Sequence, residues 1–195
     1  MSITEQKANI RKTALEKRNA LDAMHRIELS LEACKIGLEN IAHEDTDFDK
    51  SAIISGFFPF RSEIDMRPLL DRLAQAGHKV CLPAVIDKLT LEFRELSRGC
   101  PMADTGFGTR GPGEGAPIVE PDIMILPFSA FDLAGGRIGY GAGHYDRAIE
   151  KLVNKGKKPY LIGMGFCAQE VPNVPMEEHD MRLDAILTET DFHIV

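Results

Sequence analysis

The sequence predicts a three-layer α/β fold, in which a largely parallel β-sheet is flanked by helices. Its first 42 residues have apolar side chains at helical spacing, whereas from residue 51 onward short apolar runs alternate with helical segments. Such runs are typical of parallel strands that are buried on both faces. A chain of 195 residues can bury one sizeable core. We therefore expect a single domain over 1–195, with an N-terminal helical pair at 3–42 packed on an α/β core at 51–195.

Two helices are predicted before residue 42. Thr4 is a plausible N-cap for the first helix, and neither Gly nor Pro occurs before Gly37. The second helix is expected over 22–41, and each helix has an apolar stripe that should face the core. The stripes consist of Ile3, Ile10, Ala14 and Leu21 in the first helix and of Met24, Ile27, Leu31, Cys34 and Leu38 in the second.

Turn residues divide the rest of the chain into strands and helices. Gly77 is expected to end a helix, a turn is expected near 87–88, and the run from Gly106 to Pro117 has the composition of a long loop. Strands that alternate with helices favour a parallel sheet. The expected strands cover 52–58, 79–86, 90–96, 122–128, 159–166 and 185–188, and the expected helices cover 65–75 and 145–154.

Composition argues against several classes of protein. The net charge of -7 disfavours a nucleic-acid partner, because phosphate backbones require clustered Lys and Arg. No apolar run approaches the roughly 18 residues needed to cross a bilayer, and the polar start does not resemble a signal peptide. The four cysteines include no Cys-x-x-Cys pair, which favours a reduced cytoplasmic setting over a disulfide framework or zinc site. No pattern implies a membrane or protein partner, and the absence of a Gly-x-Ser-x-Gly elbow weakens a hydrolase interpretation.

The strongest chemical feature is the glycine-rich segment 135–147, which follows a predicted buried strand and precedes a helix. Glycines at 139, 141 and 143 let the backbone approach a ligand closely, and their N–H groups can bind an anion together with the start of the helix. Arg137 adds a forked donor for phosphate. The spacing matches neither the dinucleotide fingerprint nor the P-loop. Because tight turns also use glycine, spacing alone favours phosphate binding only slightly.

Asp146 adds a carboxylate at the start of the helix that follows the glycines. A carboxylate there suits the helix dipole, but beside a phosphate it would be repulsive unless a cation lay between them. Mg²⁺ usually binds one or two carboxylates together with phosphate oxygens. Asp146 therefore indicates a metal–nucleotide site, and Asp180 or Asp184 could supply a second carboxylate, although either could belong to an ordinary surface loop.

Two further candidates lie far from the glycines in sequence. Lys7, Arg11 and Arg18 are four and seven residues apart, so they share a face of the first helix. Lys7 and Arg11 could reach into a crevice, although a solvated helix edge is the common role of such side chains. Glu63 follows a buried strand, where sites form in parallel sheets, but it could equally cap a turn. The Gly106–Gly115 run is a weaker phosphate candidate, and a mobile lid suits it better.

The order Arg-x-Gly-x-Gly-x-Gly-x-Tyr-Asp at 137–146 is specific, and weaker pieces accompany it in a fixed order along nearly the whole chain. In this respect the sequence resembles the 5-formyltetrahydrofolate cyclo-ligase family, also called 5,10-methenyltetrahydrofolate synthetases. The segment 106–115 departs from the resemblance, because the family commonly has a shorter Gly-x-x-Glu-Pro element there. The weaker pieces are the Lys7/Arg11 helix, 58–65, 125–127, 130–132, 162–163, Gln169, 179–180 and 184–189.

The resemblance implies an ATP- and Mg²⁺-dependent reaction in folate one-carbon metabolism. ATP would phosphorylate the formyl oxygen of 5-formyltetrahydrofolate, and N10 of the folate would then attack the activated carbon. Ring closure would give 5,10-methenyltetrahydrofolate, ADP and phosphate. Such chemistry depends mostly on positioning and on neutralising charge at the transferring phosphoryl group. No residue is identified as a general base.

The same resemblance implies a role for each site residue. Phe58 and Glu63 would bind the folate, Asp146 and Asp180 would bind Mg²⁺, and Tyr145 would be catalytic together with Arg137. The segment from Tyr140 to His144 would lie where both substrates meet. The implied ATP-binding residues are Lys7, Arg11, Arg137, Ile138, Gly139, Tyr140, Gly141, Ala142, Gly143, His144 and Tyr145.

The family's architecture is similar to that of sugar-phosphate isomerases and CoA-transferases. An enzyme of that type, which would bind phosphate without hydrolysing ATP, is therefore the main alternative. A folate- or nucleotide-binding module without catalytic activity is the third interpretation. Turnover of 5-formyltetrahydrofolate with ATP distinguishes all three.

Overall fold

The computed structural model describes residues 2–42, 48–49, 51–87, 89–106, 108–177 and 180–195. The helices are α1 (Ile3–Ala20), α2 (Ala23–Ile41), α3 (Arg67–Gln75), α4 (His144–Asn154) and the 3₁₀ turn η1 (Cys167–Gln169). The strands are β1 (Ile53–Ser55), β2 (Lys79–Val85), β3 (Leu91–Glu95), β4 (Met102–Asp104), β5 (Arg110–Pro112), β6 (Ile123–Pro127), β7 (Ala130–Phe131), β8 (Arg137–Ile138), β9 (Tyr160–Met164), β10 (Ala185–Leu187) and β11 (Phe192–Ile194).

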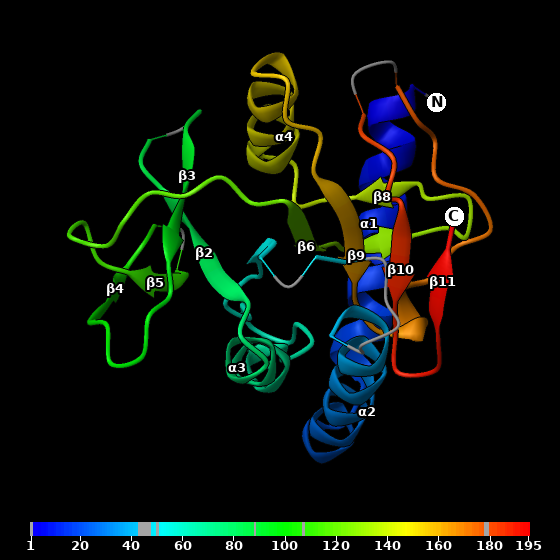
Figure 1. Cartoon of the computed structure of the whole chain (residues 1–195). Helices are drawn as coiled ribbons and strands as arrows, with labels where there is room; N and C mark the ends of the chain where they lie inside the picture. The colour runs from blue at the N-terminus through cyan, green and yellow to red at the C-terminus, as the bar shows by residue number, and fades with distance from the viewer. Residues whose placement is uncertain (1, 43–47, 50, 88, 107, 178–179) are drawn as a thin grey trace.

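A seven-stranded sheet forms the centre of the molecule (Figure 1). Its strand order is β11-β10-β9-β6-β1-β2-β3. The strands from β10 to β2 run parallel, while β11 and β3 are antiparallel edges. The predicted α/β fold with a largely parallel sheet is therefore confirmed.

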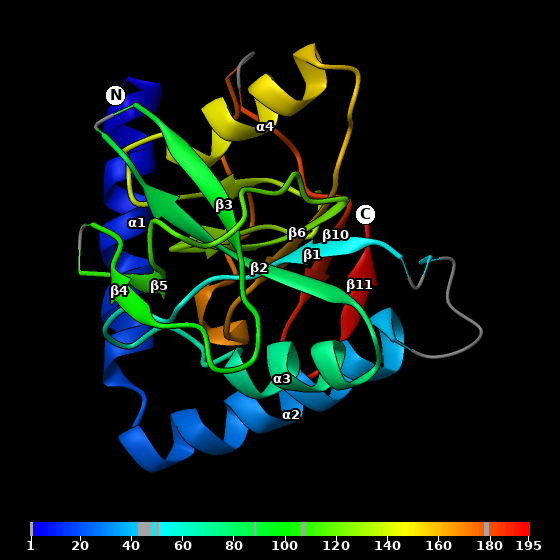
Figure 2. The ribbon, with the colours of Figure 1, turned by 60° about the vertical axis from the view of Figure 1, so that its left-hand side comes forward.

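Helices cover both faces of this sheet, with α2 and α3 on one side and α4 on the other (Figure 2). The side chains of β6 alternate between the two layers, as strand geometry requires. Ile123 and Ile125 join the core beneath α2 and α3, whereas Met124 and Leu126 join the core beneath α4. Burial on both faces explains why β6 is a continuous apolar run.

Helix α1 packs on the small β7–β8 ribbon. Ala14 of α1 is buried in a cluster with Ala130 of β7 and Ile138 of β8. Because β8 leads directly into the glycine-rich segment, this packing brings one side of α1 to the start of that segment.

The start of α1 differs from the prediction by two residues. Ser2, and not Thr4, is the N-cap. Its hydroxyl accepts a hydrogen bond from the Glu5 backbone N–H at 3.2 Å, and the Glu5 carboxylate accepts one from the Ser2 N–H at 2.8 Å. This reciprocal capping box satisfies two N–H groups at once, which Thr4 could not do with Lys7 three positions later.

The predicted core face of α2 is correct for Cys34 and Leu38, which join the core, and wrong for the three apolar residues before them. Met24, Ile27 and Leu31 are 65%, 54% and 53% exposed. The helix instead buries a face of small residues, including Ala33 and Gly37. A Cβ at Gly37 would lie 2.8 Å from the side chains of Leu69 and Leu187. Small residues therefore let α2 approach α3 and β10 closely, and this close approach determines which face is buried.

Three regions contain strands that were not predicted, and one of them is the β7–β8 ribbon. The run from Gly106 to Pro117 is not one long loop, because β5 lies within it and pairs antiparallel with β4. Phe107, in the same run, lies outside the described residues. At the C-terminus, β11 adds an antiparallel edge to β10. Strands β5 and β11 are each three residues long, which is too short for a period-two pattern to be recognised.

Candidate functional site

The glycine-rich segment crosses from β8 to α4 at the carboxyl end of the parallel strands, where ligand sites form in α/β sheets. Gly141 and Gly143 have φ angles of 95° and 65°, in the left-handed region that disfavours a side chain. Gly143 is the N-cap of α4, and no side chain within the described ranges caps this helix. The first turn of α4 is therefore suited to an anion supplied by a ligand.

Helix α1 supplies two of the predicted cations to this segment. The Arg11 Nε donates a hydrogen bond to the Gly139 carbonyl at 2.8 Å. The same guanidinium lies 3.7 Å from the position that a Cβ on Gly141 would occupy. One turn earlier, the Lys7 Nζ lies 2.5 Å from Asp180 Oδ2 and 2.8 Å from Glu177 Oε2. Lys7 and Arg11 thus lie on the side of α1 that borders the glycine-rich segment, Glu177 and Asp180.

Arg137 and Asp146 form an ion pair across the glycine-rich segment. The Arg137 Nη2 lies 2.6 Å from Asp146 Oδ1, and the side chains are 5% and 31% exposed. The Arg137 Nε is buried without a hydrogen-bond partner among the described residues. This guanidinium therefore retains a donor for a ligand, since buried polar groups normally find a partner.

Asp180 and Asp184 have different surroundings. The Asp180 carboxylate accepts hydrogen bonds from Lys7 and, at 2.7 Å, from the Glu177 backbone N–H. The Asp184 carboxylate accepts one from the Leu161 N–H at 2.8 Å, at the start of β9. Asp184 therefore anchors the sheet, whereas Asp180 lies beside the basic face of α1. His179, in the same predicted cluster, lies outside the described residues.

The segment after β1 approaches the glycine-rich segment from another side. The Glu63 carboxylate accepts a hydrogen bond from the Phe60 N–H at 2.8 Å and is also hydrogen-bonded to the Tyr140 hydroxyl. Burial raises the pKa of Glu63, and these hydrogen bonds partly oppose that effect. Phe58 lies nearby in sequence, partly buried, with the Arg67 guanidinium 5.2 Å from its ring centroid.

Two tyrosines of the glycine-rich segment face this carboxylate. Burial raises the pKa of Tyr140 and of Tyr145, and the negative charge of Glu63 raises both further. Both hydroxyls therefore remain protonated at neutral pH. Tyr145 packs partly buried against the core beneath α4, so its ring is held by the sheet.

Two residues that contact the predicted site residues were not assigned a role from the sequence. Arg18 belonged to the basic stripe of the first helix, and its Nη1 donates a hydrogen bond to the Tyr140 hydroxyl at 2.6 Å. Stripe membership was the signal that could have found it. Glu177 shares Lys7 with Asp180, but no sequence pattern distinguishes it from other surface carboxylates.

No group of three or more His, Cys, Asp or Glu side chains able to hold a metal ion occurs within the described part of the chain. Asp180 shares Lys7 with the Glu177 carboxylate, whereas Asp146 is paired with Arg137. A metal held by Asp146 and Asp180 would need further ligands from a substrate, which is the usual arrangement for Mg²⁺ on phosphates.

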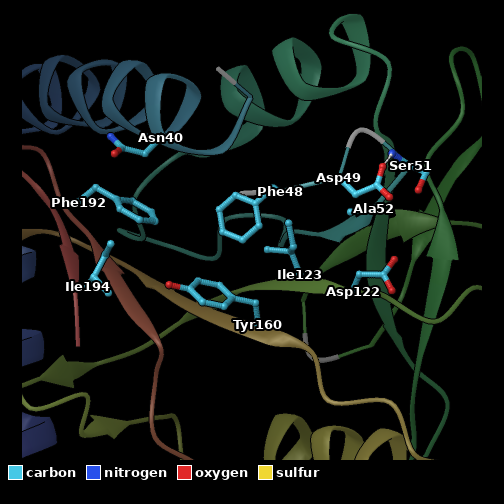
Figure 3. Close-up of a pocket in the computed structure, with 10 residues that line it drawn as sticks. All are labelled: Asn40, Phe48, Asp49, Ser51, Ala52, Asp122, Ile123, Tyr160, Phe192 and Ile194. Carbon is cyan, nitrogen blue, oxygen red and sulfur yellow. Dashed lines mark hydrogen bonds between the residues drawn. The ribbon is translucent and has the colours of Figure 1, made fainter. Parts of the chain in front are cut away.

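A separate cavity lies elsewhere, at the amino end of the sheet (Figure 3). It has a volume of about 670 Å³, and its lining includes Ala52, Ile123 and Tyr160, which lie at the starts of β1, β6 and β9. None of the predicted site residues lines it. The predicted residues instead gather at the carboxyl end, where the glycine-rich segment, α1 and the 58–63 segment meet.

A membrane-spanning segment is not found either: among the helices as described, none is both long and apolar enough to cross a bilayer.

Comparisons with known proteins give one consistent result. Residues 3–189 match the sequence model of the 5-formyltetrahydrofolate cyclo-ligase family. The chain is 28% identical to a mouse 5-formyltetrahydrofolate cyclo-ligase, covering 97% of this chain and 96% of that one. It is 34% identical to the Haemophilus influenzae enzyme of the same name, over 69% of this chain and 74% of that one.

Solved structures agree with these sequence matches. The structure of Aquifex aeolicus 5,10-methenyltetrahydrofolate synthetase superposes with a TM-score of 0.78 at 27% identity, covering 96% of this chain and 92% of that one. A 5,10-methenyltetrahydrofolate synthetase from Mycoplasma pneumoniae gives a TM-score of 0.72 at 20% identity, over 94% and 98% of the two chains, which shows the shared fold.

Proposed function

Because this chain belongs to the 5-formyltetrahydrofolate cyclo-ligase family and acts on 5-formyltetrahydrofolate with ATP, we propose that the cluster at the carboxyl end of its sheet is the site where both substrates bind. The observation that carries the proposal is the hydrogen bond from Arg11 to the Gly139 carbonyl. It ties two separate basic elements, α1 and the glycine-rich segment, into one surface. Such a surface suits a triphosphate in a chain whose net charge is -7.

ATP phosphates bind along this surface. Lys7, Arg11 and Arg137 supply the positive charge, and the backbone from Gly139 to the start of α4 supplies N–H donors. Among the described residues the Arg137 Nε has no hydrogen-bond partner. We assign it to ATP, because a phosphate oxygen would satisfy this donor.

The two proposed Mg²⁺ ligands are each paired with a proposed phosphate ligand. Asp146 is paired with Arg137, and Asp180 is paired with Lys7. With MgATP bound, Lys7 and Arg137 would pair with phosphate oxygens, and Asp146 and Asp180 would be the carboxylates that hold the metal. Both carboxylates and phosphate oxygens are hard ligands, so the set fits Mg²⁺. When bound, Mg²⁺ neutralises charge on the phosphates as the phosphoryl group is transferred.

The folate binds on the other side of the glycine-rich segment. Glu63 is a partly buried carboxylate that can accept hydrogen bonds from the N–H groups of the pterin, and Phe58 offers a ring on which the folate can pack. The protonated hydroxyls of Tyr140 and Tyr145 are donors at the junction of the two substrates. With the two substrates bound in this way, the formyl oxygen would lie beside the γ-phosphate.

The reaction then proceeds in two steps. The γ-phosphoryl group transfers to the formyl oxygen and ADP leaves. N10 attacks the activated carbon, loses its proton, and phosphate departs with the former formyl oxygen. Arg137 stabilises the transferring phosphoryl group, and Tyr145 holds the reacting oxygen by hydrogen bonding. The reaction needs no covalent enzyme intermediate, so positioning carries most of the catalysis.

Separate Michaelis constants for the two substrates test this arrangement. Lys7→Gln and Arg11→Gln should each raise the KM for ATP by about tenfold, because each removes a charged hydrogen-bond donor to phosphate, while the KM for folate changes little. Lys12→Gln is the matched control, since Lys12 is exposed on the same helix. If Lys7→Gln and Arg11→Gln behaved like Lys12→Gln, α1 would have no part in ATP binding.

A further inference from the structure

We propose that Arg18 is a positioning residue that holds the folate side of the site, by fixing Tyr140 and the 62–63 segment in one hydrogen-bonded unit. The inference rests on the proposed function, because it deepens the role given there to Glu63 and Tyr140. It assigns a role to the third member of the basic stripe on α1, which neither substrate needs to touch.

Arg18 is a buried charge that requires a structural explanation. The residue is only 2% exposed, although it lies in the last turn of a helix whose neighbouring residues Lys17 and Asn19 are exposed. A buried guanidinium is costly unless it is paired and hydrogen-bonded. The partners of Arg18 therefore indicate what it is there to hold.

These partners come from the two segments that form the proposed folate site, which are the segment after β1 and the glycine-rich segment. The Arg18 Nε donates a hydrogen bond to the Ser62 Oγ at 3.0 Å, and the Nη1 donates one to the Tyr140 hydroxyl at 2.6 Å. The guanidinium carbon also lies 5.8 Å from the centre of the Tyr140 ring. Ser62 in turn donates to the Asn19 side chain, so α1 holds the segment after β1 through two adjacent residues.

Tyr140 passes this restraint on to Glu63. Its hydroxyl accepts a hydrogen bond from Arg18, and the same hydroxyl lowers the pKa of the Glu63 carboxylate, which couples the proposed pterin ligand to α1. The positive charge of Arg18 also favours the ionised form of this carboxylate. Arg18 therefore helps to position the segment that carries Glu63, through Ser62 and Tyr140, and adds to the effects that favour its ionised form.

The position of Arg18 along α1 separates this role from ATP binding. Arg18 lies eleven positions after Lys7, which corresponds to about 16 Å along a helix. Lys7 contacts Glu177 and Asp180, whereas Arg18 contacts Ser62 in the segment after β1. One helix thus supports both substrates, each from a different end, with Arg11 between them at Gly139.

The test compares Arg18→Met with Arg18→Lys and with the exposed control Lys17→Met. Arg18→Met should raise the KM for folate about tenfold or more, because charged hydrogen bonds are lost, and should leave the KM for ATP within about twofold. Arg18→Lys keeps the charge and should restore part of the folate affinity. A uniform fall in kcat with both KM values unchanged, or equal effects on both substrates, would overturn the proposal.

The pH profile provides a readout that loss of packing would not change. The groups facing Glu63 are Arg18 from α1, and Tyr140 and Tyr145 from the glycine-rich segment and α4. Without Arg18, the acid limb of kcat/KM for folate should move to higher pH, and Glu63→Gln should remove that limb. An unmoved limb in Arg18→Met would contradict the proposal.

Two further variants keep the inference separable from the proposed site. Tyr140→Phe removes the shared hydroxyl, so its effect on folate KM should not add to that of Arg18→Met. If Arg18→Met fails to fold, Arg18→Lys and Tyr140→Phe still decide the question, because simple additivity would refute the connection. If Glu63→Gln leaves folate KM unchanged, the proposed folate site itself is wrong. If Glu63→Gln raises the KM for folate but the Arg18 variants leave it unchanged, only the inference about Arg18 fails.

Discussion

At the scale of single residues, the site is defined by carboxylates and cations that neutralise one another. Lys7 with Asp180, and Arg137 with Asp146, form two compact pairs in the structure. Each pair joins one proposed phosphate ligand to one proposed metal ligand. Because both members of a pair must find new partners when MgATP binds, the metal and the nucleotide should assist each other's binding.

Glu63 gives the clearest pH prediction. Burial raises its pKa above the ordinary value of 4.5. The ionised carboxylate is the form that accepts hydrogen bonds from the pterin, so kcat/KM for 5-formyltetrahydrofolate should fall as the pH is lowered through this raised pKa. The acid limb should therefore lie above pH 4.5.

A matched pair of profiles checks this assignment. Glu63→Gln should have a lower kcat/KM for folate at neutral pH and should lack the acid limb, whereas Asp71→Asn, a change on α3, should keep the wild-type profile. An acid limb that persists unchanged in Glu63→Gln would assign the titration to another group.

Order along the chain was enough to select Asp146 and Arg137 as candidate site residues. Asp146 follows three regularly spaced glycines at the start of a predicted helix, and Arg137 precedes them. The structure brings the two side chains into one ion pair, and their roles stay predictions. Arg18 and Glu177 could not be assigned in this way. Their partners, Tyr140 and Lys7, are more than a hundred residues away in the chain, so only the fold brings them together.

At the scale of elements, the sequence predicted best the strands with long apolar runs. Very short strands, and helix faces that pack through small residues, were predicted poorly. The strand at β6 is buried on both faces and was found from its run alone. The face of α2 was misassigned, because the helix packs through Ala33 and Gly37 while Met24 and Leu31 remain exposed. Hydrophobic size predicts burial only where neighbouring elements leave room for it.

This packing gives a stability prediction for α2. Gly37→Val should lower the free energy of unfolding by about 1–3 kcal/mol, because its side chain would overlap those of Leu69 and Leu187. Met24→Gln and Leu31→Gln should change it by no more than about 0.5 kcal/mol, since both positions are exposed.

Urea unfolding of the three variants, followed by far-UV circular dichroism, measures these differences. Comparable losses of stability for Gly37→Val and Leu31→Gln would contradict the close packing of α2 on α3 and β10.

At the scale of the whole molecule, α1 packs on the β7–β8 ribbon and connects the parts of the site. The sheet places the segment after β1 and the glycine-rich segment at the same edge. Helix α1 then contacts the glycine-rich segment through Arg11, the segment after β1 through Arg18, and Glu177 through Lys7. The basic stripe read from the sequence is therefore the feature that gathers segments from the beginning, middle and end of the chain.

The central claim is that MgATP binds at the glycine-rich segment through these paired charges, and calorimetric titration with a non-hydrolysable ATP analogue tests it most directly. In the wild type, Mg²⁺ should strengthen binding of the analogue by about tenfold or more. Asp146→Asn should lose most of this enhancement, while Glu150→Gln, an exposed change on the same helix, should keep it. Full Mg²⁺ enhancement in Asp146→Asn would contradict the account.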